Sequence, residues 1–156
     1  MALKEELGLK RGYKIPAHEA LLNIYYTTSI LKKRADVFFA EFGLTDVQYN
    51  LLALLDHQVG DEGGLSQAQI SDMMLVNRAN ITSLVDRMER ADLVKRTAHL
   101  NDRRYNIVKL TTKGRKLFEK VEPIYIEKVE QVMNGLRKTE LKVLMTALEK
   151  VRSHLR

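Results

Sequence analysis

The 156-residue chain contains no cysteine, and nowhere do eighteen apolar residues run together. The absence of cysteine excludes disulfides, thiolate zinc sites and thiol redox sensing within this chain. The first residues, MALKEELGLKRGYKIP, lack the continuous apolar core of a signal peptide, so we expect a cytoplasmic protein that does not enter a membrane.

Motifs for catalysis and cofactor binding are also missing. The glycine-rich stretch GDEGG, residues 60–64, lacks the lysine and hydroxyl residues of a phosphate-binding loop. The Ser, His and Asp residues stand in no nucleophile-elbow context. The four histidines show no ligand spacing, although a zinc site shared between two subunits remains an alternative. We therefore predict no enzyme activity, no cofactor and no metal.

The size and charge of the chain fit a single basic domain. Hydrophobic residues make up 45% and charged residues 29%, which is ordinary for a folded globular protein. Lys and Arg number 26 against 20 Asp and Glu, giving a formal net charge of +6, which suits an anionic partner such as nucleic acid.

Helical periodicity dominates both ends of the chain. Apolar residues recur at helical spacing from Pro16 to Phe42, and Gly43 follows as a stop signal. Thr45 and Gln48 form a capping box that starts a second helix. From Thr112 onward two further helices are expected, separated near Arg137.

The middle of the chain predicts a winged helix-turn-helix. A capping box at Ser66 starts a short helix to about Met74, and Asn77 is a good N-cap for a second helix from Arg78 to Ala91. Two β-prone segments follow, residues 93–99 and 105–110, joined by turn formers. The expected fold is therefore mainly α-helical with a small β-hairpin wing.

In this geometry the second short helix enters a DNA major groove while the hairpin tip reaches the minor groove or the phosphates. The core stripe of that helix leaves short polar side chains facing outward, which suit base edges. Charge gathers in the same segment, because residues 77–116 hold eleven basic and four acidic residues. The predicted DNA-contacting residues are Arg78, Ala79, Asn80, Thr82, Ser83, Arg87, Arg103 and Arg104.

The segment from Asp102 to Gly114 carries the pattern Asp-x-Arg-x-x-x-Val-x-Leu-Thr-x-x-Gly. On this signature, and on the upstream stretch NITSLVDRMERADLVKR, the chain resembles the MarR family of bacterial transcription regulators. Arg96 stands at the spacing usual for the family before Asp102. The resemblance implies that Arg104 enters the minor groove and that Asp102 holds its guanidinium in place.

The resemblance further implies an obligate homodimer on a pseudo-palindromic double-stranded operator. Residues 16–43 and 112–156 would form the dimerisation helices around a DNA-binding region at 44–111, with residues 1–15 as an N-terminal arm. The leading hypothesis is a repressor that a small aromatic or anionic effector releases from DNA. Candidate effector contacts are Tyr25, Tyr26, Phe38 and Tyr49, whose alternative role is core packing.

Two positions depart from the family pattern. Asp92 stands where Gly is common, and Asp tolerates a positive φ less well than Gly. Arg137 replaces the usual Ser or Thr cap of the last helix, with Thr139 as an alternative start. A winged-helix module that binds protein is the competing hypothesis, and the local surplus of basic charge disfavours it.

Overall fold

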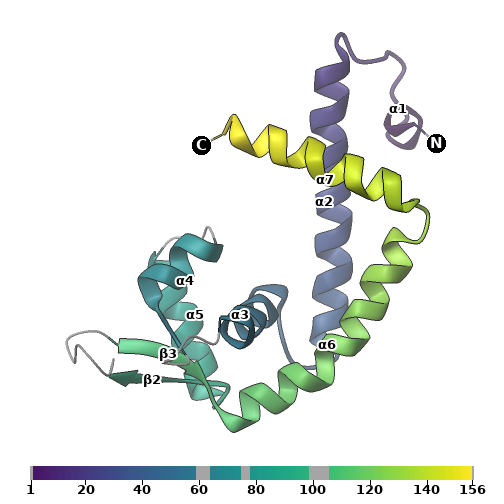
Figure 1. Cartoon of the computed structure of the whole chain (residues 1–156). Helices are drawn as coiled ribbons and strands as arrows, with labels where there is room; N and C mark the ends of the chain where they lie inside the picture. Colours follow the sequence, from purple (N-terminus) through teal and green to yellow (C-terminus); the bar gives the residue numbers. More distant parts are fainter. Residues whose placement is uncertain (1, 59–63, 75–77, 99–105, 156) are drawn as a thin grey trace. The chain divides into compact units, whose positions relative to one another are not determined.

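The computed structural model describes residues 2–58, 64–74, 78–98 and 106–155 (Figure 1). One compact unit spans Met1–Arg115 and a second spans Lys116–Arg156. In chain order the elements are α1 (Leu3–Glu6), α2 (Pro16–Ala40), α3 (Asp46–His57), β1 (Leu65–Ser66), α4 (Gln67–Met74), α5 (Arg78–Arg90), β2 (Val94–Ala98), β3 (Asn106–Leu110), α6 (Thr112–Met133) and α7 (Lys138–Ser153).

The long first helix predicted from the sequence is present as α2. Pro16 occupies its first turn, where the missing N–H removes no helical hydrogen bond. The helix ends at Ala40, and Gly43 turns the chain with a φ of 70°. The turn brings α3 back against the end of α2, where the rings of Phe39 and Tyr49 stack with centroids 4.5 Å apart.

Both predicted capping boxes are formed. Thr45 Oγ1 accepts the Gln48 N–H at 3.2 Å, and the Gln48 side chain accepts the Thr45 N–H at 2.9 Å. Ser66 and Gln69 repeat this exchange at 3.2 and 2.8 Å. Each box satisfies backbone donors that a helix start otherwise leaves open, so α3 and α4 begin where the sequence predicts.

Residues 44–115, which we call the winged-helix lobe, enclose one hydrophobic core. α5 contributes its predicted apolar stripe, which consists of Ile81, Leu84, Val85 and Met88, and these four side chains are buried. Other buried core residues come from α3, α4 and the sheet. Together with the stripe of α5, the core includes Leu51, Leu52, Leu55, Ile70, Ile81, Leu84, Val85, Met88, Val94, Ile107 and Val108.

The sheet of the lobe has three antiparallel strands in the order β1-β3-β2. Val94 pairs with Leu110 and Ala98 with Asn106, which is the hairpin that the sequence predicts. β1 was not predicted, and it pairs Leu65 with Val108. Two residues are too few to show a strand's alternating pattern, so β1 becomes visible only through its partner strand.

Asp92 makes a left-handed turn just after the end of α5. Its φ is 58°, and its N–H donates to the Glu89 carbonyl at 2.9 Å. The next N–H, that of Leu93, donates to the Met88 carbonyl at 2.9 Å. These two bonds form the C-terminal motif that usually places Gly at this position, and Asp92 adopts the positive φ that the motif requires.

Replacing Asp92 by Val is expected to lower the free energy of unfolding by about 1–2 kcal/mol, because β-branched residues resist a positive φ. Replacement by Gly should leave stability within about 1 kcal/mol of the wild type, since relief of strain opposes a larger unfolded-state entropy. Urea denaturation at one protein concentration measures both variants. Equal stability of the two would contradict this turn geometry.

α7 begins at Lys138 with Arg137 as its N-cap residue, so the alternative start at Thr139 is wrong. The Arg137 side chain caps nothing. Instead the Glu140 carboxylate accepts the Arg137 N–H at 2.8 Å and the Arg137 guanidinium at 3.1 Å. The Glu140 side chain therefore satisfies the backbone N–H of the N-cap residue, as in the acidic half of a capping box, although the usual Ser or Thr is missing.

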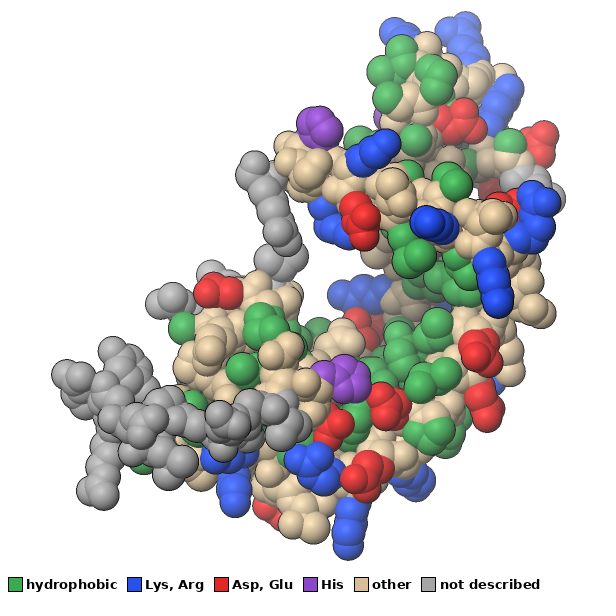
Figure 2. Space-filling model, viewed as in Figure 1, with side chains coloured by type: hydrophobic (Ala, Val, Ile, Leu, Met, Phe, Trp, Pro, Cys, Tyr) green, Lys and Arg blue, Asp and Glu red, His purple; other side chains and the backbone are tan. Residues whose placement is uncertain are grey.

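Large apolar side chains lie open on the long helices of each unit (Figure 2). None of the helices in the described ranges is long and apolar enough to cross a membrane. The exposed apolar side chains of α2 are Leu21, Tyr25, Ile30, Leu31 and Val37, and those of α7 are Val143, Leu144, Met145 and Val151.

Candidate nucleic-acid interface

One face of α5 is covered by the lobe and the other faces outward. The buried stripe centres on Val85 and Met88. On the outward side the exposed residues are Ala79, Asn80, Thr82, Ser83, Arg87 and Arg90. α5 thus presents small polar and basic groups that can approach base edges and phosphates.

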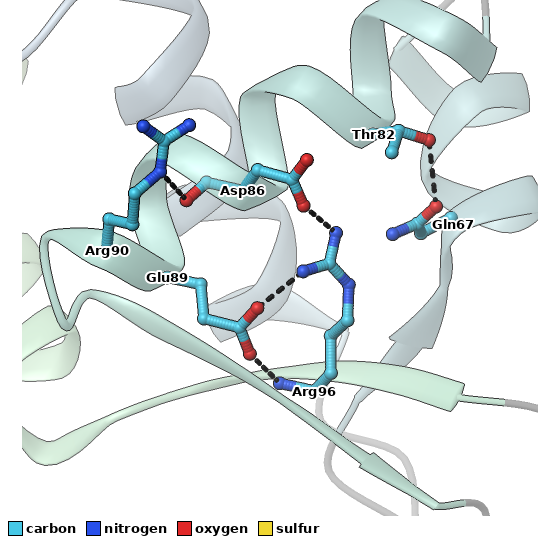
Figure 3. A network of polar contacts seen from close by, with 6 residues as sticks. All are labelled: Gln67, Thr82, Asp86, Glu89, Arg90 and Arg96. Atoms are coloured by element: carbon cyan, nitrogen blue, oxygen red, sulfur yellow. Dashed lines mark hydrogen bonds and ion pairs between the residues drawn. The ribbon is translucent and has the colours of Figure 1, made fainter.

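Arg96 of β2 joins the wing strand to α5 (Figure 3). Its Nη2 pairs with Asp86 Oδ1 at 2.5 Å, and its Nη1 pairs with Glu89 Oε2. The backbone N–H of Arg96 donates to Glu89 Oε1 at 2.9 Å. Because Arg96 is partly buried and holds two carboxylates three residues apart on one helix, it fixes the orientation of the strand against α5.

Gln67, the first residue of α4, extends this network to a third element. Its carboxamide lies 3.1 Å from Thr82 Oγ1. With the amide nitrogen facing Thr82, its oxygen accepts from Nη2 and Nε of Arg96 at 3.0 and 3.1 Å. This orientation satisfies donors and acceptors on both sides, so α4, α5 and β2 share one polar network.

The network predicts a pH dependence. The backbone N–H of Arg96, aided by its guanidinium, holds the pKa of the Glu89 carboxyl below its usual range. A carboxyl group with a lowered folded-state pKa stabilises the protein above its unfolded-state pKa, and that stabilisation is lost as the pH falls through the folded value. We expect the stability difference between wild type and Glu89→Gln to shrink below about pH 4.3.

Urea denaturation of both proteins between pH 7 and pH 3 measures this difference. Glu119→Gln, on an exposed side chain of α6, is a control that should show no such trend. A difference between wild type and Glu89→Gln that stays constant over the whole range would argue against the bond between Arg96 and Glu89.

The Leu-Thr-x-x-Gly part of the signature fastens the start of α6 to the end of α5. Thr111 Oγ1 donates to the Asp92 carbonyl at 2.6 Å and accepts the Gly114 N–H at 3.0 Å. Lys113 Nζ donates to the Ala91 carbonyl at 2.7 Å. Gly114 is buried with its Cα against the Leu93 backbone, where any side chain would collide. These contacts explain why the motif has Thr at position 111 and Gly at position 114.

Two predicted DNA contacts, Arg103 and Arg104, and the predicted wing-positioning residue Asp102 belong to the segment between β2 and β3, outside the described residues. The side chain of Arg78 also lies outside the described part of the chain. The sequence did not single out Gln67, Asp86 or Glu89 as a network. The only signal was the spacing of Asp86 and Glu89 along α5, with Arg96 on the strand that follows.

The four predicted effector contacts do not form one cluster within this chain. Phe38 contacts the rings of Phe39 and Phe42, and Phe39 in turn stacks on the buried Tyr49. Tyr25 lies thirteen residues before Phe38 on α2, or about 20 Å along the helix, and is 64% exposed. Tyr26, beside it, is half-buried. In the described part of the chain no group of three or more His, Asp or Glu side chains is placed to hold a metal ion.

The helices α4 and α5 are followed by the β2–β3 hairpin, and the preceding β1 completes a three-stranded sheet. This arrangement defines the winged helix-turn-helix class. A MarR family model matches residues 42–104. The regulator FarR of Neisseria gonorrhoeae is 30% identical over 115 residues, covering 72% of this chain and 76% of FarR. The regulator PecS of Dickeya dadantii is 29% identical over 128 residues, covering 81% of this chain and 76% of PecS.

Solved structures agree with this assignment. The Staphylococcus aureus MepR–DNA complex superposes with a TM-score of 0.77 at 26% identity, covering 85% of this chain and 94% of the MepR chain. The chain belongs to the MarR family and is a DNA-binding transcription regulator. Membership in this family of DNA-binding regulators also agrees with the prediction that the chain is not an enzyme.

Proposed function

We propose that the chain is a homodimeric repressor that binds a pseudo-palindromic operator through α5 in the major groove and the wing in the minor groove. One observation carries the proposal: the outward polar face of α5 is fixed to the wing strand by Arg96, with bonds to both Asp86 and Glu89. This linkage keeps two DNA-reading elements at a set distance. The basic surplus in residues 77–116 favours a DNA partner over a protein partner.

Exposed apolar faces support the dimer. A monomer rarely leaves large apolar side chains open along entire helices, and α2 and α7 each do so. We assign residues 16–43 and 112–156 to dimerisation, 44–111 to DNA binding and 1–15 to an arm, in a cytoplasmic protein. Two copies then present two α5 helices to successive major grooves, which makes a pseudo-palindromic site the natural target.

The wing supplies the second contact. Arg104, with Asp102 holding its guanidinium and Arg103 beside it, would insert into the minor groove, where a narrow groove concentrates negative potential. Support comes from the register of β2 and β3, which pairs Ala98 with Asn106, the residues that flank this segment in the sequence.

Arg104→Ala should weaken operator binding by about 1–3 kcal/mol while the dimer stays intact. Fluorescence anisotropy gives the affinity, and circular dichroism with analytical ultracentrifugation gives the fold and the dimer. If fold, dimer and affinity were all unchanged, the assignment of Arg104 to the minor groove would be wrong.

For the effector, the aromatic cluster at the end of α2 supports a site at Phe38, on α2, and Tyr49, on α3 within the winged-helix lobe. Tyr25 and Tyr26 belong to a separate stretch of α2. A small aromatic or anionic molecule bound at Phe38 and Tyr49 would favour dimers that cannot bind DNA, and DNA would therefore be released.

The test is fluorescence anisotropy of the purified protein on DNA from upstream of its own gene, against a scrambled duplex, at two salt concentrations. We expect tighter binding to the upstream DNA and an affinity that falls steeply with salt, because Lys and Arg displace counterions from phosphates. An affinity independent of salt would overturn the proposed backbone contacts.

A further inference from the structure

The outward face of α5 has two edges with different surroundings. At about 100° per residue, Thr82, Asp86 and Glu89 lie on one edge, and Asn80, Ser83 and Arg87 lie on the other, within about 60° of one another. The first edge is engaged by the lobe, because Thr82 contacts Gln67 while Asp86 and Glu89 pair with Arg96. Figure 3 shows these three side chains turned toward Gln67 and Arg96.

The second edge is open. Asn80, Ser83 and Arg87 are exposed, and no side-chain hydrogen bond or ion pair joins any of them to another residue in the described ranges. Side chains already committed to an internal network cannot offer the same donors and acceptors to a base without breaking it. The open edge is therefore the part of α5 available for recognition.

We propose that Asn80 determines operator specificity by reading an A·T pair, and that Arg87 contacts a phosphate. Asn80 lies in the first turn of α5, the part of a recognition helix that meets base edges, and its carboxamide matches the donor and acceptor of adenine in the major groove. Arg87 lies two helical turns later, where its long cationic side chain can reach a phosphate of the DNA backbone. Ser83 lies between them and allows close approach.

Thr82 then has a different role from the DNA contact that the sequence predicts. Its hydroxyl meets Gln67, and Gln67 meets Arg96, so Thr82 positions α5 relative to the wing strand. This inference rests on the proposed sequence-specific binding. It assigns base reading to Asn80, phosphate contact to Arg87 and the positioning of α5 to Thr82.

The test is selection from a random duplex library with four full-length proteins: wild type, Asn80→Ala, Arg87→Ala and Thr82→Val. We expect the wild type to select a motif in which each half-site holds one A·T pair that Asn80→Ala no longer prefers, a loss of roughly tenfold or more in discrimination. Thr82→Val, which keeps the side-chain shape and removes the hydroxyl, should select the same bases as the wild type.

Arg87→Ala should weaken binding to all sequences alike and reduce the slope of log K against log salt by about one, while Arg87→Lys restores the slope. These substitutions are on exposed positions, and the melting temperature of each variant checks that the fold is kept.

Four results would overturn the inference. Unchanged base preferences for Asn80→Ala would remove Asn80 as the reader. A base preference lost in Thr82→Val would place the reading edge on the other side of α5. A guanine preference lost in both Arg87→Ala and Arg87→Lys would make Arg87 a base contact. If the wild type itself selected no sequence, sequence-specific binding would fail, and this inference with it.

Discussion

Gly114→Ala is expected to lower the free energy of unfolding by about 3 kcal/mol or more. A Cβ at this position would lie 1.9 Å from the Leu93 carbonyl oxygen and 2.9 Å from its carbonyl carbon. Both atoms belong to the backbone, so no flexible side chain can move aside, and α6 would have to separate from the end of α5. The hydrogen bonds of Thr111 and Lys113 to the same turn would be strained together with it.

Chemical denaturation of wild type and variant at equal protein concentration measures this effect, because the stability of a dimer depends on concentration. Gly135→Ala is the matched control, since a Cβ there meets nothing within 4 Å. Its stability should stay within about 0.5 kcal/mol of the wild type. Equal effects of the two substitutions would show that Gly114 is not tightly packed against Leu93.

Arg96→Met is expected to weaken DNA binding by more than about tenfold, and to reduce stability by about 1–3 kcal/mol. The variant keeps an unbranched side chain of similar length but leaves Asp86 and Glu89 without their cation. Two unpaired carboxylates beside the reading face would then repel DNA phosphates, and the wing strand would lose its bonds to α5.

Lys95→Met controls for the loss of one positive charge, because Lys95 is the exposed neighbour of Arg96 on the same strand. Anisotropy on operator DNA and thermal melting should separate the two variants, with Arg96→Met the weaker on both measures. If both lost the same affinity with unchanged stability, Arg96 would act through net charge alone and not by positioning the wing.

Local patterns predicted most of the helices and the hairpin. The capping residues Thr45 and Ser66 act within four residues of themselves, and the stripe of α5 follows from helical periodicity, so neighbouring residues were enough to place them. Asp92 was noted because it stands where the family commonly has Gly, and it adopts the positive φ for which Gly is the usual residue.

Contacts between distant residues were not predictable in this way. The Gln67–Thr82–Arg96 network joins three elements, and its members are separated by up to 29 positions in the numbering. β1 exists only through pairing with β3, more than 40 residues later. The sequence likewise grouped Tyr25 with Phe38, although the length of α2 keeps them apart in one chain.

The most direct test of the central claim is dimethyl sulfate protection on a bound operator duplex. The reagent methylates guanine N7 in the major groove and adenine N3 in the minor groove, so one measurement reports both proposed contacts. We expect two patches of protected guanine N7 about 10 base pairs apart, each with protected adenine N3 in the adjacent minor groove. Protection of a single patch, or of the minor groove alone, would contradict a dimer that reads DNA with two α5 helices and two wings.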